Sequence, residues 1–334
     1  MKIRTITYSR NVFIPVTNVC RNKCHYCGFR RDPHNGWLMK PDEIKALGER
    51  ARAAGCCEAL ITLGERPEVY PSYSLKLSDL GYRTTVDYLV DISRMMLNMN
   101  LLPHTNAGSI TYEEMKKLRR YNASMGLMLE CATRLPAHEE SPGKRPEVRL
   151  EVIRNAGELK IPFTTGLLIG IGESRKDRLF SLFEIKKIQE RYGHIQEVII
   201  QPFSPKPNTV MESCPPPSLS EVIWTVRKAR EILEDVAIQV PPNLIDLSPP
   251  NVLAILDAGA NDFGGISPIT PDFINPENPW PEVEKLRTIV ESLGFRLRER
   301  LPIYPKFVMD EQFMSAEVKR IVRSLSDEAG YRAG

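Results

Sequence analysis

The sequence of 334 residues predicts an α/β protein in which parallel strands, each followed by a helix, close into a TIM-type (β/α)8 barrel. Strand-like and helix-like segments alternate from residue 12 to about residue 203. The strand-like segments are apolar rather than alternating, which is typical of a parallel sheet that helices cover. Polar and glycine motifs follow one strand after another, and a barrel gathers such motifs at one end.

Six strand–helix units carry this pattern. We expect strands at 12–17, 57–63, 101–105, 124–130, 163–169 and 197–203. The helices that we expect between them lie at 41–54, 84–99, 112–121, 147–159 and 175–192. Pro41 suits the first turn of the first helix, and Gly55 suits its end.

The last two units of the barrel are less regular. Residues 204–220 are rich in proline and predict a long loop. We expect helices at 221–233, 250–257 and 282–293 and a short strand at 237–240, whereas 259–281 predicts a loop-rich segment. The sequence therefore predicts one domain, 1–334, with a regular core at about 10–205 and looser closing units and a C-terminal tail at 206–334.

Composition and charge exclude several classes of protein. The 45 basic and 42 acidic residues leave a net charge of +3, which is too balanced for a nucleic-acid or membrane-surface protein. No run of 18 apolar residues predicts a membrane span, and the first residues lack the pattern of a signal peptide. Seven cysteines, an odd number, argue against a secreted disulfide framework. We therefore expect a cytoplasmic protein.

Three of these cysteines lie directly after the first expected strand. Cys20, Cys24 and Cys27 have the spacing C-x3-C-x2-C. Thiolates at this spacing can bind a soft metal ion or an iron–sulfur cluster. A structural zinc site needs four ligands, and His25 or His34 could supply the fourth. A 4Fe–4S cluster with three cysteine ligands instead keeps one iron open, as an enzyme requires.

This motif after the first strand of a βα barrel resembles the radical S-adenosylmethionine (SAM) enzymes. The resemblance implies that the three thiolates hold a 4Fe–4S cluster and that its open iron binds the amino and carboxylate groups of SAM. An electron from an external donor then cleaves SAM to methionine and a 5′-deoxyadenosyl radical, which abstracts a hydrogen atom from the substrate. The alternatives from another class are a non-catalytic iron–sulfur electron carrier and a zinc-structured scaffold.

The same resemblance implies which residues contact SAM near the cysteines. Tyr26 occupies the position of an aromatic residue that contacts adenine. Gly64 and Glu65 follow the second expected strand, where the superfamily usually has Gly-Gly-Glu and the backbone approaches the SAM amino group. Leu63 replaces the first of those glycines, so the match is partial.

Later segments complete the implied SAM site. Glu130 ends the fourth expected strand, and by resemblance it binds SAM, while Arg149 on the next helix binds the SAM carboxylate. A guanidinium suits a carboxylate because it can form two parallel hydrogen bonds. Gly170 lies in a glycine-rich segment that lets the backbone approach the adenosine.

Longer segments resemble a narrower family, the CofG subunits of 7,8-didemethyl-8-hydroxy-5-deazariboflavin (FO) synthase. The segments are PVTNVCRNKCHYCGFR, LPHTNAG, SPGK, YGHIQEVIIQPFSPK and GGISPITPDFINPENPWP. In this family the CofH partner joins tyrosine to a ribitylaminouracil, and CofG closes the ring of that adduct with loss of ammonia. The product, FO, is the chromophore of a deazaflavin coenzyme. The alternatives within the superfamily are a CofH subunit, a menaquinone-pathway cyclase and biotin synthase.

The implied small-molecule substrate carries a phenol, a pyrimidinedione and a polyol, so its pocket needs apolar surface with several polar groups. His104 and Asp262 are candidates for handling the proton that accompanies ammonia loss, although each could equally be a structural hydrogen-bonding group. The other candidates for substrate contact also come after expected strands: Thr105, Asn106, Gln201 and Asn243.

Overall fold

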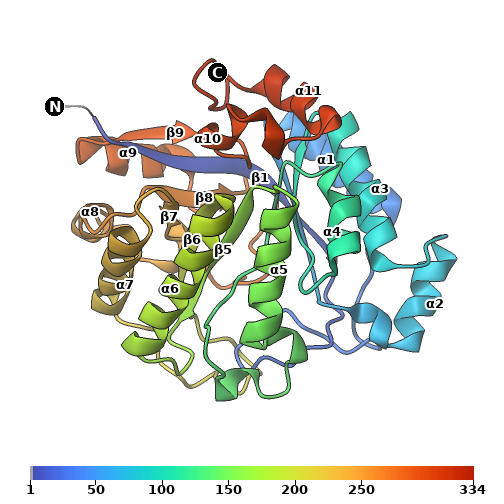
Figure 1. Ribbon diagram of the computed structural model, residues 1–334. Helices are drawn as coiled ribbons and strands as arrows, with labels where there is room; N and C mark the ends of the chain where they lie inside the picture. The colour runs from blue at the N-terminus through green and yellow to red at the C-terminus, as the bar shows by residue number, and fades with distance from the viewer. Residues whose placement is uncertain (1–2) are drawn as a thin grey trace.

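The computed structural model describes residues 3–334, and within that range nine strands form one sheet whose neighbours are all parallel. The first strand pairs with both the second and the eighth, so that eight strands close into a barrel. Helices surround this barrel on its outer side (Figure 1). The predicted fold class is therefore confirmed.

The elements keep chain order around the barrel. The strands are β1 (Thr5–Thr17), β2 (Glu58–Leu63), β3 (Leu102–Asn106), β4 (Ser124–Gly126), β5 (Phe163–Ile169), β6 (Ile195–Pro202), β7 (Ala237–Gln239), β8 (Asp262–Ile266) and β9 (Arg296–Glu299). The helices are α1 (Pro41–Ala53), α2 (Pro71–Asp79), α3 (Thr85–Asn98), α4 (Tyr112–Arg119), α5 (Pro146–Glu158), α6 (Arg175–Tyr192), α7 (Leu219–Ile232), α8 (Pro249–Asp257), α9 (Val283–Ser292), α10 (Pro305–Val308) and α11 (Ala316–Leu325).

Side-chain caps set the points at which several helices begin. Thr111 and Ser174 each accept a hydrogen bond from the backbone N–H three residues later, at the starts of α4 and α6. Helix α6 ends at Gly193, whose φ of +65° is a conformation that glycine adopts at low cost. Among the described residues, no helix is both long enough and apolar enough to cross a membrane.

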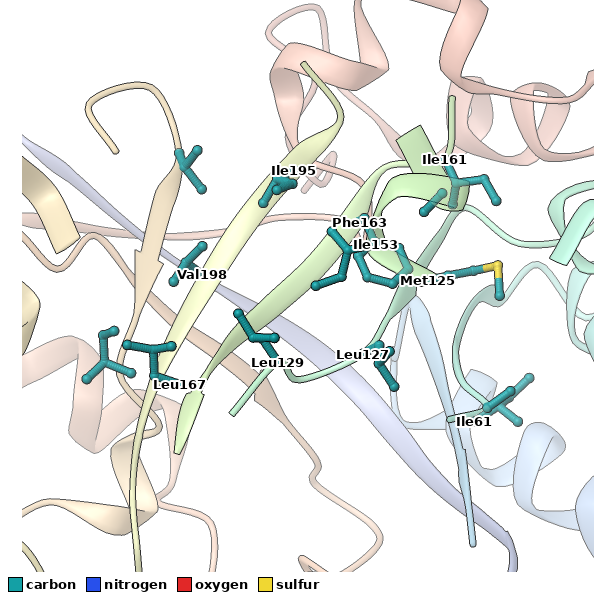
Figure 2. Close-up of a cluster of buried hydrophobic side chains, with 14 of the residues drawn as sticks. Ile61, Met125, Leu127, Leu129, Ile153, Ile161, Phe163, Leu167, Ile195 and Val198 are labelled. Atoms are coloured by element: carbon teal, nitrogen blue, oxygen red, sulfur yellow. The ribbon is translucent and has the colours of Figure 1, made fainter. Parts of the chain in front are cut away.

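The main hydrophobic core lies between the outer face of the barrel and the helices. Figure 2 shows part of it, with side chains from β2, β4, β5, β6 and α5 packed together. Successive residues of a strand point to opposite faces. Thus Ile61 is buried in this layer, whereas Leu60 and Thr62 line the interior of the barrel. The packed outer layer therefore holds the inner side chains at fixed positions.

The structure differs from the sequence-based expectation at both ends of the chain. Strand β1 begins at Thr5 rather than residue 12, and β8 lies inside the segment that we expected to be loops. The sequence of β8 misleads because it contains two glycines. A Cβ atom on Gly264 would lie 2.1 Å from Gln239 Nε2, so this glycine serves close packing inside the barrel rather than a turn.

The expected C-terminal tail is instead an ordered cap. Strand β9 pairs with the first half of β1, and α10 and α11 follow it over the amino-terminal end of the barrel (Figure 1). A second hydrophobic cluster joins this cap to residues that precede or begin β2, β3, β4 and β7: it contains Cys57, Leu102, Ala123, Ala237, Leu301, Ile303, Phe307, Val318 and Ile321. The amino-terminal end is thereby covered, and the functional motifs lie at the other end.

Candidate active site

One cavity of about 380 Å³ occupies the barrel interior and extends to the cysteine loop. Alternate residues of the strands line it, as the two-residue period of a strand requires. Its floor includes Arg300 and Pro302, which follow β9, and its mouth includes all three cysteines of the motif. The inner residues of three strands illustrate the alternation: Asn11 and Phe13 of β1, Glu58, Leu60 and Thr62 of β2, and Glu197, Ile199 and Gln201 of β6.

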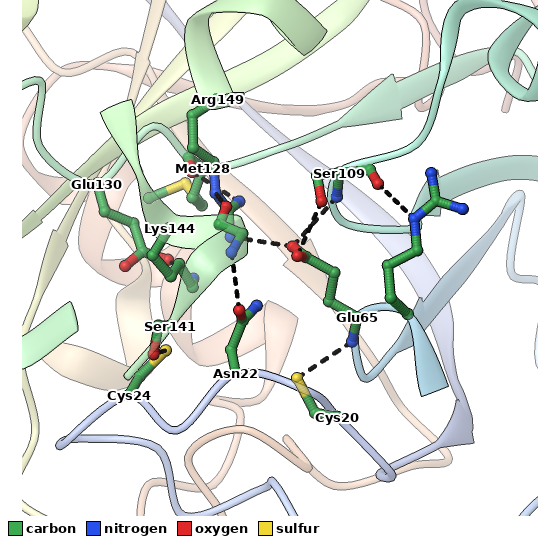
Figure 3. A network of polar contacts seen from close by, with 12 residues as sticks. Cys20, Asn22, Cys24, Glu65, Ser109, Met128, Glu130, Ser141, Lys144 and Arg149 are labelled. Carbon is green, nitrogen blue, oxygen red and sulfur yellow. Dashed lines mark hydrogen bonds and ion pairs between the residues drawn. The ribbon is translucent and has the colours of Figure 1, made fainter. Parts of the chain in front are cut away.

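The cysteine thiols lie at the mouth of this cavity and accept hydrogen bonds from their surroundings. Cys20 Sγ accepts one from the backbone N–H of Glu65 at 3.2 Å, and Cys24 Sγ accepts one from the Ser141 hydroxyl at 3.4 Å (Figure 3). Within residues 3–334, no group of three His, Cys, Asp or Glu side chains is arranged to hold a single metal ion. A 4Fe–4S cluster has separate iron atoms for separate thiolates.

Gly64 lets the end of β2 lie directly against the cysteine loop. Its backbone N–H donates to Thr17 O at 2.8 Å, and the N–H of Arg21 donates to Glu65 O at 3.0 Å. A Cβ atom at position 64 would lie 2.1 Å from Val19 O, which is backbone and cannot turn aside. Gly64 therefore positions the loop, and its expected contact with SAM stays a prediction.

Replacing Gly64 by alanine should displace the cysteine loop. We expect a loss of roughly 1–3 kcal/mol of stability, which is typical of forced overpacking, together with less iron bound per chain. Gly28→Ala is the matched control, because a Cβ there would lie 2.8 Å from the Lys206 side chain rather than from backbone. Thermal unfolding and iron analysis measure both variants. Equal losses for the two would show that the Gly64 contact has no special role.

The buried side chain of Glu65 connects three segments around the cysteine loop (Figure 3). Its carboxylate accepts hydrogen bonds from the Arg21 side chain at 3.0 Å and from the Ser109 hydroxyl at 2.8 Å. The Arg149 guanidinium lies 3.5 Å away. Burial alone would raise the pKa of Glu65, but Arg149, the Ser109 hydrogen bond and Arg21 outweigh it and lower that pKa to about 2. Glu65 is therefore ionised.

A second buried carboxylate, that of Glu130, lies across the mouth and follows β4. It contacts the Tyr26 hydroxyl and the Lys144 amino group, and His138 Nε2 lies 3.0 Å away. Burial opposes ionisation, yet the charge of Lys144 and the hydrogen bond with His138 hold the pKa of Glu130 well below its usual range. The φ of Glu130 is +65°, a conformation that costs energy for a residue with a side chain and that clusters at functional sites.

Two cations complete the mouth of the cavity. Arg149 of α5 is buried, and it donates from Nε to Gly143 O at 2.8 Å and from Nη1 to Met128 O at 3.0 Å. Lys144 lies in a short turn, Pro142–Lys144, just before α5, and lines the cavity beside Glu130. Lys144 was not among the residues predicted from the sequence. The sequence signal for it is the segment SPGK, which forms a turn that begins with Pro142 and lies directly before α5.

These residues fit a three-cysteine cluster with SAM beside it. SAM carries an amino group, a carboxylate and an adenosine. The cavity mouth offers ionised Glu130 and the two cations Arg149 and Lys144 within one lining. The Tyr26 ring also lines the cavity, and its hydroxyl is held by Glu130 and by His138 at 2.9 Å. The expected SAM contacts of Tyr26, Glu65, Glu130 and Arg149 stay predictions, and the structure brings all four to one cavity.

His104 lies within β3 rather than after it, and it faces the cavity. Its Nδ1 lies 2.7 Å from Ser124 Oγ, and Ser124 donates its hydroxyl hydrogen to Pro302 O at 2.8 Å. Because that carbonyl can only accept, Ser124 must accept from His104, so Nδ1 carries the hydrogen and Nε2 is an acceptor. Burial and the charge of Arg300 lower the pKa of His104 to about 4. His104 is therefore neutral near pH 7.

The other expected substrate residues divide into two groups. Asn106, Gln201 and Asn243 line the cavity. Thr105 does not, because it points to the outer face of β3, where its hydroxyl donates to Asn122 Oδ1 at 2.6 Å. The sequence located the strand correctly but could not show which of its faces turns inward.

Two further residues lie outside the cavity lining. Asp262 begins β8 rather than following a strand, and it pairs with Arg300, whose Nε lies 2.7 Å from Oδ2. It belongs to the buried ion pair below the cavity floor, so its proposed proton transfer to the substrate is not supported. Gly170 has a φ of +95°, a Cβ atom there would lie 2.8 Å from the Pro217 side chain, and its expected approach to the adenosine stays a prediction.

Residues 14–185 match the model of the radical SAM superfamily. A 7,8-didemethyl-8-hydroxy-5-deazariboflavin synthase of Archaeoglobus fulgidus is 53% identical over 331 residues, which cover 98% of this chain and 99% of the relative. The synthase of the same name from Methanopyrus kandleri is 51% identical over 336 residues, which cover 98% of this chain and 99% of the relative.

Solved structures show the same fold at low sequence identity. The crystal structure of methylornithine synthase (PylB) has a TM-score of 0.68 and 18% identity, covering 88% of this chain and 83% of that chain. HydG, a maturase of the FeFe-hydrogenase, has a TM-score of 0.69 and 17% identity, covering 96% of this chain and 77% of that chain.

Enzymes of the radical SAM superfamily use a 4Fe–4S cluster and SAM. The chain belongs to this superfamily and, within it, to the family of 7,8-didemethyl-8-hydroxy-5-deazariboflavin synthases.

Proposed function

We propose that the chain is a radical SAM lyase of the CofG type that makes FO in deazaflavin coenzyme biosynthesis. Its substrate is 5-amino-5-(4-hydroxybenzyl)-6-(D-ribitylimino)-5,6-dihydrouracil, the tyrosine-derived adduct. The products are FO, ammonia, methionine and 5′-deoxyadenosine. The observation that carries the proposal is the 53% identity, over nearly all of both chains, to a relative named for this product.

The proposed reaction balances in atoms and electrons. The adduct loses ammonia and two hydrogen atoms when a carbon–nitrogen bond closes the new ring. This bond joins the ribityl-bearing nitrogen to the phenol-ring carbon ortho to the benzylic methylene, and the C–H bond at that carbon and the C–NH2 bond at the pyrimidine are among those that break. One hydrogen atom ends in 5′-deoxyadenosine, and the second leaves as a proton and an electron. That electron replaces the one used to cleave SAM. The external donor is therefore needed only to start the reaction.

Each group at the cavity mouth has a proposed role in binding. Cys20, Cys24 and Cys27 hold the cluster, which when bound supplies the electron that converts SAM to methionine and a 5′-deoxyadenosyl radical. Arg149 and Lys144 provide positive charge for the SAM carboxylate. The capped floor of the barrel restricts water entry from the amino-terminal end, as radical chemistry requires.

We assign His104 the role of a proton acceptor within the cavity. Its Nε2 is the acceptor nitrogen, and its Nδ1–H is held by Ser124. Because its pKa is about 4, it cannot be the acid that protonates departing ammonia at neutral pH. It can accept a hydrogen bond, or transiently the proton released as the new ring becomes aromatic.

The direct test is FO formation by anaerobically reconstituted protein. Purified CofH product, SAM and a chemical reductant are supplied, and FO is identified by absorbance and mass. We expect FO and 5′-deoxyadenosine in equal amounts. If the protein has the brown colour of an intact cluster but forms no FO, the proposal is ruled out. Formation of the adduct from tyrosine and the ribitylaminouracil would instead assign the CofH reaction.

The partner and the compartment follow from the same proposal. A CofH subunit supplies the adduct, whether by stable association or by release into solution. All seven cysteines are free thiols in the structure, and reducing compartments keep thiols in this state. We therefore propose a cytoplasmic location, where an external electron donor is also accessible.

A further inference from the structure

Asn11 is a buried amide whose polar atoms are both unused. Its side chain lies on the inner face of β1, lines the cavity and is 0% exposed. Neither Oδ1 nor Nδ2 has a hydrogen-bond partner among residues 3–334. Most buried polar side chains are hydrogen-bonded, because leaving a donor or acceptor unpaired costs free energy. The position of Asn11 inside a ligand-sized cavity therefore points to a bound molecule as its partner.

Asn11 lies deep in the cavity, far from the cysteines. It is paired in register with Glu58 at the start of β2, and six residues separate it from the end of β1. At the rise of a strand this is roughly 20 Å along the chain direction. The cavity lining at this depth also contains Glu58, Glu197 and Arg300. The floor is therefore polar.

The lining directly above this floor contains three apolar side chains, beside the polar His104 and Gln239 at the same level. Phe13, Leu60 and Ile199 each come two residues after a polar floor residue on the same strand, so they lie closer to the cysteines. A ligand with one polar end and one aromatic part would thus place its polar end against the floor. The adduct has this division, because its phenol and its pyrimidinedione are joined by one methylene.

The chemistry of the Asn11 carboxamide indicates which polar group of the substrate it can bind. Asn11 presents one acceptor and one N–H donor side by side in a single plane. A cyclic imide presents the complementary pair, an N–H beside a C=O, and the two groups can join through two parallel hydrogen bonds. The hydroxyls of a polyol rotate freely and do not require such a fixed pair.

We propose that Asn11 binds the imide edge of the substrate's pyrimidinedione at the floor of the barrel. The identity of the substrate rests on the proposed function. Gly265 of β8 supports this role, because a Cβ atom there would lie 2.1 Å from Asn11 Nδ2. The absence of a side chain at Gly265 leaves room for the amide inside the barrel.

The decisive variant is Asn11→Leu, which keeps the branching and the number of side-chain atoms but removes both hydrogen-bonding groups. We expect kcat/KM for the adduct to fall roughly 100-fold, mainly through KM, since two buried hydrogen bonds are lost. Cleavage of SAM in the absence of adduct should not change. Calorimetric titration of the adduct, with SAM but no reductant, should show the same loss of affinity without requiring turnover.

Thermal unfolding of the ligand-free protein separates this role from a structural one. Asn11→Leu should leave the Tm unchanged or raised, because the unpaired buried amide is removed. Asn122→Leu is the matched control. Its amide bonds with Thr105, Ser93 and Leu118 O, so this variant should lower the Tm. A comparable drop in Tm for both would assign Asn11 to the scaffold and overturn the proposal.

Two modified adducts identify the group that Asn11 recognises. Methylation of the imide nitrogen should weaken binding to the wild type by a similar factor but cause no further loss in Asn11→Leu. Removal of ribityl hydroxyls should affect both proteins equally. If Asn11→Leu instead loses only its sensitivity to the hydroxyls, the amide binds the polyol and the proposal is wrong. Adduct that binds through Asn11 but yields no FO would refute the proposed function while leaving this inference intact.

Discussion

Cys24→Ala is expected to abolish FO formation and to remove the brown colour of the anaerobically purified protein. Cys24 is one of three thiols at the cavity mouth, and its sulfur accepts a hydrogen bond from Ser141. With two thiolates left, the cluster is no longer held, so no electron reaches SAM. Activity should fall by more than about a thousandfold, as for removal of any group that acts as part of a unit. Iron analysis, visible absorbance and FO formation measure the effect.

Cys214→Ala is the matched control for this experiment. Cys214 is also a partly exposed free thiol, but it lies in the proline-rich segment outside the cavity lining. This variant should keep its colour, its iron and its activity. Retention of iron and activity by Cys24→Ala would contradict the cluster assignment, and zinc in place of iron in the wild type would indicate a structural metal site.

Glu65→Gln is expected to destabilise the protein by about 3 kcal/mol near neutral pH. This loss follows from the pKa of Glu65, which falls from 4.5 to about 2 on folding, because each pKa unit corresponds to about 1.4 kcal/mol. Glutamine keeps the shape of the side chain but removes the charge that Arg149 and Arg21 neutralise. Denaturant unfolding of the cluster-free protein measures the loss, and weaker cluster incorporation should accompany it.

The effect of Glu65→Gln should depend on pH in a defined direction. A carboxyl group whose pKa is lowered by folding stabilises the folded state above its unfolded pKa. That contribution disappears as the pH falls from about 4.5 through about 2. The stabilities of the wild type and the variant should therefore converge across this range. A difference that stayed constant down to pH 2 would exclude the charge as its cause.

Glu140→Gln tests whether burial matters for these ion pairs. Glu140 pairs with Lys23 of the same cysteine loop at 2.6 Å, but both side chains are exposed. Water and salt screen such a pair, so the variant should be close to the wild type in stability and cluster content. Equal losses for Glu140→Gln and Glu65→Gln would show that the geometry of the loop, not buried charge, controls its stability.

The parts of the fold that the sequence predicted well are those set by local patterns. The strand at 163–169 ends in the apolar run Leu167 to Ile169, and the helix at 175–192 has a capping serine before it and a glycine after it. Strand β8 was missed because its two glycines are required by neighbouring strands, which no local pattern reveals. The C-terminal cap was missed because its apolar residues make sense only against the starts of distant strands.

The site shows the same division between local and distant information. The cysteine motif is contained in eight residues, so its chemistry could be read directly. The role of Lys144 depends on its contact with Glu130 across the cavity mouth. Whether His104 or Thr105 faces the cavity depends on which face of β3 turns inward. Asn11 carried no motif, since its distinguishing property is the lack of a partner within residues 3–334.

The pairing of β1 with β9 implies an order of assembly during synthesis. Tyr8 and Glu299 are neighbours in the sheet although 291 positions separate them in the chain. The cysteine loop leaves the ribosome well before Arg300 and Pro302, which form the cavity floor. The first strand must therefore wait, with one edge unpaired and prone to aggregation, until β9 has emerged. The floor of the cavity is thus closed only after β9 has been made.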